Sequence, residues 1–146
     1  MESVHDTSHR ARLRQRILAL TADSTRQWGA MTVDQMLWHV GVAMEGALGR
    51  RTVTPVKPPI PAAILKLLVF NLPWPKNSPT APDMLTRERH NFADVRQHCL
   101  DLVEAMAGHP LGGPWEPHPA FGRLTGKQWS RLTAMHLDHH LRQFGA

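Results

Sequence analysis

The chain has 146 residues, of which 42% are hydrophobic and 20% charged, a balance typical of a globular protein that excludes a disordered chain. This length predicts a single domain, residues 1–146, with one substantial core. The formal net charge of +5 is compatible with nucleic acid, an anionic lipid surface or an acidic ligand. The arginines of residues 10–16 have no interleaved aromatic residues and no groove-reading motif follows them, so we expect no nucleic-acid partner.

Cysteine content and hydropathy indicate the compartment. The single cysteine, Cys99, excludes an internal disulfide and a multi-cysteine zinc site, and is interpreted as a small core residue. The first residues are charged and lack the apolar core of a signal peptide. The longest apolar run, residues 60–70, is interrupted by Lys66 and is too short to cross a bilayer. We therefore expect a cytoplasmic protein without a membrane partner.

The periodicity of apolar residues is helical, and strand signals are almost absent. A first helix is expected over about residues 7–20. A second begins at Thr32, where the letters TVDQ form a capping box, and ends near Gly49. The third helix is expected over residues 86–108, and the last runs from a second capping box, TGKQ at residues 125–128, to about Phe144.

Residues 50–85 form a long connection between the second and third helices. Eight prolines leave room there for one short helix, at about residues 62–70. Four long helices with one such connection predict an all-α four-helix bundle containing a Pro-rich crossover. The length of the crossover permits the second and third helices to run parallel, which would give an up-down-down-up order.

Three histidines point into the expected bundle from two helices. On the last helix, His136 and His140 lie in the middle of the apolar stripe, His139 lies on its shoulder, and Asp138 lies on the solvated side. On the second helix, His39 lies at the edge of the inner face. Three buried imidazoles without partners would leave several donors and acceptors unsatisfied. A divalent metal such as Zn, Ni, Cu or Fe would satisfy them, and three ligands plus water form the open arrangement of a catalytic site.

The other histidines are interpreted as unrelated to this site. An HxxxH spacing alone is weak evidence, and its second copy, His5 and His9, is expected to arise by chance in a frayed N-terminus without apolar surroundings. His90 is expected on the third helix, solvated or at a helix interface. His118 lies in a loop. A position near the mouth of the metal pocket is the less favoured interpretation for it.

Two long motifs, WGAMTVDQMLWH and HPAFGRLTGKQWSRLTAMHLDHHLRQFG, together with LPWPKNSPTAP, resemble the DinB/YfiT-like superfamily and specifically its DUF1569 branch. The resemblance covers about residues 10–146. It implies an up-down-down-up four-helix bundle, often dimeric, with nickel or zinc held by one histidine on the second helix and two on the last. His39, His136 and His140 match these positions.

The resemblance also implies a chemistry. Characterised relatives in the superfamily use such a metal to activate a low-molecular-weight thiol for transfer or isomerisation, and others are described as metal hydrolases. We therefore expect an enzyme that activates water or a small thiol such as bacillithiol, mycothiol or glutathione. Gln35, about one turn before His39, could orient a ligand, and His139 could act beside the metal or as a general base, with packing an equal alternative. The alternative function is a non-catalytic dimeric binding or stress-response module, in which the metal is structural or absent.

Overall fold

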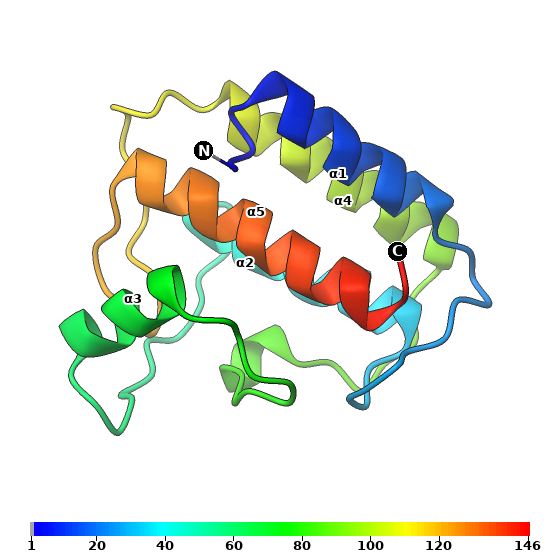
Figure 1. The fold of residues 1–146 in the computed structure, drawn as a ribbon, viewed down its shortest axis with the longest axis horizontal. Helices are drawn as coiled ribbons and strands as arrows, with labels where there is room; N and C mark the ends of the chain where they lie inside the picture. Colours follow the sequence, from blue (N-terminus) through cyan, green and yellow to red (C-terminus); the bar gives the residue numbers. More distant parts are fainter. Residues whose placement is uncertain (1) are drawn as a thin grey trace.

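The computed structural model describes residues 2–146, which form α-helices and one short 3-10 turn, without any strand in that range (Figure 1). The elements are α1 (Thr7–Ala19), α2 (Val33–Ala47), α3 (Ala62–Asn71), η1 (Pro82–Met84), α4 (Phe92–Gly108) and α5 (Gly126–Gln143). The all-α class and the short helix within the crossover are therefore confirmed.

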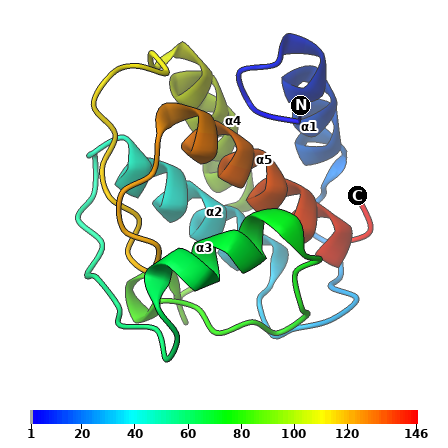
Figure 2. The same cartoon turned by 60° about the vertical axis from the view of Figure 1, so that its left-hand side comes forward.

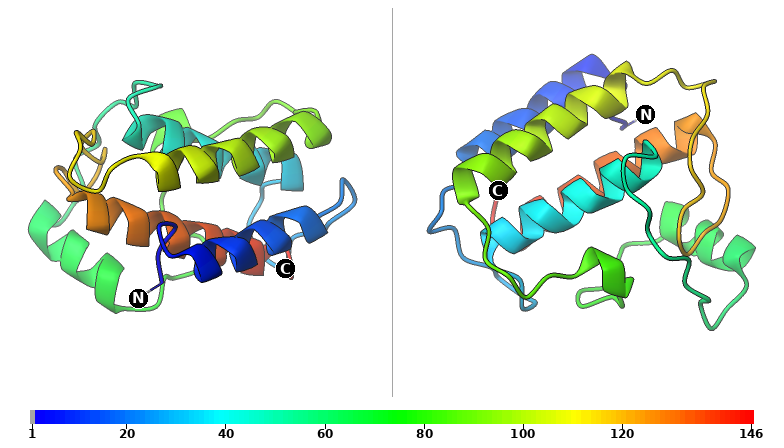
Figure 3. Two further views of the ribbon diagram at one scale, coloured as in Figure 1. Left: turned by 90° about the horizontal axis from the view of Figure 1, so that it is seen from above. Right: turned by 180° about the vertical axis from the view of Figure 1, so that it is seen from behind.

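The four long helices contact one another in a closed ring, in which α2 packs on α4, α4 on α1, α1 on α5 and α5 on α2. Figures 1 and 3 show that α1 and α5 run in one direction and that α2 and α4 run in the other. The long connection between α2 and α4 is what allows these two neighbours to run parallel. Helix α3 lies outside the ring, beside α5 (Figure 2).

The core lies between the long helices and is built from their apolar stripes. Each fully buried Leu, Ile or Met contributes about 1.5–3 kcal/mol relative to an exposed side chain. Cys99 belongs to this core, and its burial raises the pKa of the thiol to about 12, so it is a packing residue and not a nucleophile. The largest fully buried residues include Leu13, Ile17, Met36, Leu37, Met44, Leu102, Met106 and Leu141.

Side-chain caps set the ends of the helices. At the start of α5, the Thr125 hydroxyl accepts from the Gln128 N–H (3.1 Å) and the Gln128 side chain accepts from the Thr125 N–H (2.9 Å), which confirms the expected capping box. At the start of α2, the Gln35 side chain accepts from the Thr32 N–H at 3.0 Å. These caps place the two helices that carry the histidine cluster.

The third long helix begins six residues later than expected. It starts at Phe92, where the Asn91 side chain accepts from the N–H of Asp94, a typical N-cap. The preceding residues are held out of the helix by Asp34 of α2. Arg89 donates to both carboxylate oxygens at 3.0–3.2 Å, and the His90 N–H donates to one of them at 2.8 Å.

This correction also moves His90. It lies in the turn ahead of α4, and its ring stacks on Trp38 with 5.6 Å between centroids and an interplanar angle of 14°. The sequence of residues 86–91 is compatible with a helix, but the buried Asp34 carboxylate on α2 accepts the His90 N–H. This bond competes with the helical hydrogen bond that the same N–H would otherwise make.

The Asp34 contact yields a stability prediction. Burial by itself would raise the pKa of Asp34, but the hydrogen bonds from Arg89 and the His90 N–H outweigh it and hold the pKa below its usual range. We expect Asp34→Ala to lower the free energy of unfolding by about 1–2 kcal/mol at pH 7, mostly because the His90 N–H loses its acceptor. The ion pair adds little, since Arg89 is largely exposed.

Chemical denaturation of this variant, with the exposed Asp23→Ala as a control, measures the effect. Because the folded pKa is depressed, the contribution is fully present above the unfolded pKa of about 3.9 and is lost as the pH falls towards the folded value. The difference between wild type and Asp34→Ala should therefore shrink below about pH 4. An equal loss in both variants would contradict this account.

Candidate metal centre

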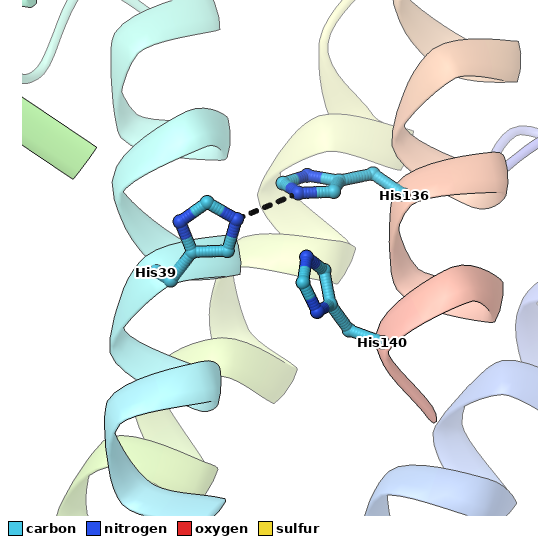
Figure 4. Close-up of side chains that lie close together, drawn as sticks. All are labelled: His39, His136 and His140. Atoms are coloured by element: carbon cyan, nitrogen blue, oxygen red, sulfur yellow. Dashed lines mark hydrogen bonds between the residues drawn. The ribbon is translucent and has the colours of Figure 1, made fainter. Parts of the chain in front are cut away.

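Three imidazoles converge between α2 and α5 (Figure 4). The ring centroids of His39, His136 and His140 lie 4.8–4.9 Å apart, and one nitrogen from each ring lies within 4.8 Å of the other two. The Nε2 atoms of His39 and His136 are 2.9 Å apart. This is a hydrogen-bond distance (Figure 4). It is shorter than the separation of about 3.4 Å between two nitrogens bound to one tetrahedral ion, so the two rings would move slightly apart to share a metal.

The helices explain this convergence. His136 and His140 are four residues apart, so one turn of α5 places them on the same face. The packing of α2 on α5 brings His39 opposite them. His39 and His140 are buried and His136 is half-buried. The cluster therefore occupies the seam between two helices and is shielded from bulk water.

Burial keeps all three rings neutral. It lowers the pKa of His39, of His136 and of His140, and the neighbouring imidazoles lower the pKa of His136 and His140 further because a second positive charge would be repelled. For His140 the pKa falls to about 3. Neutral imidazole is the form that binds a metal, so the site is prepared for a cation at physiological pH.

Two of the rings are oriented by hydrogen bonds on their outer nitrogens. His39 Nδ1 lies 2.9 Å from the Met84 carbonyl oxygen, and His140 Nδ1 lies 2.7 Å from Gln143 Oε1. An oxygen that only accepts requires Nδ1 to carry the proton, which leaves the Nε2 lone pair free in the neutral ring. Metal-binding histidines are typically held in this way.

The orientation of Gln143 is fixed in turn. Its Nε2 donates to the Trp28 carbonyl oxygen at 2.9 Å, so its Oε1 must face His140. Gly29 makes room for the amide, because it adopts a φ of +80° and a Cβ there would lie 2.5 Å from Gln143 Nε2. The loop between α1 and α2 thus supports a ring on α5.

Neither of these supporting groups was expected from the sequence. Gln143 follows His140 by three residues, and this helical spacing was a signal that could have identified it. The Met84 carbonyl is a backbone atom in the crossover, and no residue type marks it.

Aromatic residues cover one side of the cluster. The Trp74 ring, from the crossover, lies 6.0 Å from the ring of His136 and 5.5 Å from that of His139, and Trp28 lies 5.9 Å from His139. His139 is only half-buried; burial and the nearby Arg142 lower its pKa. His139 therefore lies beside the cluster, at its more exposed edge.

The other candidate residues lie elsewhere. Both polar groups of Gln35 are bonded elsewhere: its side chain accepts from the Thr32 N–H at the start of α2 and donates, at 3.2 Å, to the Glu88 carbonyl oxygen ahead of α4. Asp138 pairs with Arg16 and Arg142, at 2.8 Å in each case, on the side of α5 that the helical periodicity assigned to solvent.

His118 lies in the loop before α5 and is held rigidly. Its Nδ1 accepts from the N–H groups of Ala120 and Phe121 at 3.0 and 3.1 Å, and its ring stacks on Phe121 with 4.0 Å between centroids. The ring also lies 5.4 Å from Trp129, two turns before His136 on α5. Burial lowers the pKa of His118 to about 4.

The N-terminal histidines are better ordered than expected. His5 Nδ1 lies 2.7 Å from the Ser130 hydroxyl and its Nε2 lies 2.9 Å from the His109 carbonyl oxygen, while His9 is buried. The interpretation of this segment as frayed and without apolar surroundings was therefore wrong. These contacts attach the start of the chain to α5 and to the end of α4.

Within residues 2–146, His39, His136 and His140 are the one group of three or more potential ligands close enough to hold an ion. Three nitrogen ligands leave one position of a tetrahedral ion open. None of the helices in this range is both long and apolar enough to pass through a bilayer.

The fold and this cluster define a helical protein with an internal three-histidine site positioned to bind a metal ion. The chain belongs to the DUF1569 family, described as proteins of unknown function, whose model matches residues 7–146. The resemblance to DUF1569 is thereby confirmed. Searches of the curated proteins and of the solved structures found no significant match.

The hydrogen bond to His140 yields a prediction about metal affinity. Gln143→Met keeps the size of the side chain but removes the acceptor, so we expect zinc or nickel affinity to fall about 10–100-fold. Competition against a chromophoric chelator measures this affinity. Gln97→Met on α4 is the matched control, because Gln97 is exposed and bonds only to Asp101. Equal affinities in the two variants would show that Gln143 does not support the site.

Proposed function

We propose that this protein is a divalent-metal-dependent enzyme whose three-histidine site activates a small thiol or water, in a thiol S-transferase or a hydrolase reaction. One observation carries the proposal. Three neutral imidazoles face one another in a shielded seam, and two of them have their Nδ1 protons fixed so that Nε2 carries the lone pair that a metal needs. A purely structural zinc site would normally have a fourth protein ligand.

His39, His136 and His140 would hold the ion, and nickel or zinc are the ions that the family resemblance implies; neutral imidazoles suit both. The bound ion would supply Lewis acidity and lower the pKa of a thiol or water at the open position. Met84 and Gln143 keep the ligand nitrogens aimed, and Trp74 limits the access of water to one side.

His139 is the proposed general base. Its lowered pKa leaves it neutral at pH 7, and its half-exposed ring borders the cluster. Lys76 lies over the Trp28 ring, with its Nζ 4.8 Å from the ring centroid, and could attract the carboxylate of an anionic thiol. Gln35 is a weaker candidate, because both of its polar groups are already bonded.

The proposal includes the wider setting of the enzyme. We also propose that the chain belongs to the DinB/YfiT-like superfamily, which is supported by the direction of the four long helices and by the position of the histidines. A cytoplasmic homodimer is the state in which we expect it to act.

The second candidate is a non-catalytic, metal-stabilised dimeric module. It is supported by the same cluster, because an ion bound there would cross-link α2 to α5 and would stabilise the folded state. The two candidates differ in whether an outside ligand can reach the ion.

Metal analysis of protein purified without a histidine tag tests the site. We expect about one equivalent of zinc or nickel in the wild type and a near-complete loss in His136→Gln/His140→Gln. His5→Gln/His9→Gln is the matched control, since it removes two histidines of the same spacing and should keep the metal. Circular dichroism reports whether each variant is folded.

The outcomes separate the candidates. Loss of the metal with the helical content intact supports an open functional site. Loss of the metal together with global unfolding supports the structural module, and a wild type that binds neither ion contradicts both.

Access to the ion is a separate prediction. Titration of cobalt-substituted protein with glutathione or 2-mercaptoethanol should produce a thiolate-to-cobalt charge-transfer band, because the fourth position is open. His139→Gln should give the same final band but a slower approach to it in stopped-flow mixing, since the base that accepts the thiol proton is gone and a general base changes a rate, not an equilibrium. A spectrum unchanged by any thiol would exclude the transferase form of the proposal.

A further inference from the structure

Helix α3 presents an apolar face to solvent. Leu67 is 63% exposed, Leu72 55%, Ile64 50% and Leu68 39%. Their spacing of three, four and eight residues from Ile64 places them in one stripe, which continues just past the end of the helix. A surface helix usually turns this stripe towards the core. Within α3 only Phe70 is buried, so most of this apolar helix faces solvent.

The segment of the chain that carries this stripe is rich in basic residues. Residues 46–82 contain no Asp or Glu but five cations, a number equal to the formal net charge of the chain. Arg51 is already paired with Glu45. The five cations are Arg50, Arg51, Lys57, Lys66 and Lys76.

A shallow groove of about 410 Å³ runs between α3 and the first half of α5. Leu67 and Phe70 supply its apolar wall, and Lys66, Lys127 and Arg131 supply the basic one. Apolar side chains thus alternate with cations over a surface that includes two helices.

We propose that the exposed face of α3 docks on an anionic lipid bilayer surface. The helix is far too short to span a membrane, but an apolar stripe can enter the headgroup region while flanking cations bind anionic lipid. The expectation of no membrane partner depended on the absence of a spanning segment, which does not bear on a helix lying at the interface.

A second copy of this chain fits the face less well. Two copies meeting through α3 would bring Lys66, Lys127 and Arg131 of both into one interface, and no carboxylate is among the described residues that line the groove they share. An anionic bilayer satisfies the apolar stripe and the cations together. This inference is independent of the metal centre and does not require it to be catalytic.

Vesicle cosedimentation of the full-length, tag-free protein tests the proposal. We expect binding to vesicles of equal parts phosphatidylcholine and phosphatidylglycerol at low ionic strength, and little binding to phosphatidylcholine alone. Added salt should weaken the binding, because exposed charges are screened.

Two variants separate the apolar from the charged contribution. Leu67→Gln/Leu68→Gln should weaken binding by about tenfold or more, and Lys66→Gln/Lys127→Gln should also weaken it about tenfold or more. Leu18→Gln on α1 is the matched control, because Leu18 is 51% exposed but lies outside this face. Circular dichroism confirms that the variants remain folded, as is expected for exposed positions.

Several results would overturn the proposal. These are equal binding to neutral and anionic vesicles, no binding to either, or equal loss in the α3 and Leu18 variants. Light scattering measures the oligomeric state. If the wild type is a dimer that binds no vesicles, and Leu67→Gln/Leu68→Gln is a monomer, the face is an interface with a second copy of the chain.

Discussion

The burial of three imidazoles between two helices is the constraint on which the rest of the structure depends. A buried ring nitrogen without a partner costs free energy, so each one must find a donor, an acceptor or a cation. His39 obtains its acceptor from the crossover, and His140 obtains its acceptor from Gln143, which is anchored to the loop before α2. Three segments far apart in sequence are thereby assembled around one small polar volume in an otherwise apolar core.

The crossover contributes groups to this polar site. Asp34 holds its far end through Arg89 and His90, so the chain enters α4 at a defined point. Between its two ends the crossover supplies the Met84 carbonyl and the ring of Trp74, which the cluster uses on two sides. Contacts with α2 and α5 thus help to order a segment that contains eight prolines.

Much of this could be predicted from the sequence, because the relevant signals are local. Helical periodicity and two capping boxes placed the ends of α2 and α5 within a few residues, and the same periodicity selected His39, His136 and His140. The start of α4 was misplaced because its competitor, Asp34, lies more than fifty residues away along the chain. The Met84 carbonyl was unpredictable for a similar reason, since any residue type can supply a backbone oxygen.

The hydrogen bond between His39 and Met84 has a thermodynamic consequence. It makes the position of the crossover one of the variables that determine how well the three nitrogens converge. A ligand that holds the crossover in this position would therefore raise the affinity of the histidines for a cation. By linkage, a bound cation would strengthen the binding of that ligand by the same factor. Ligand binding at the crossover and cation binding at the three histidines would thus be coupled in both directions.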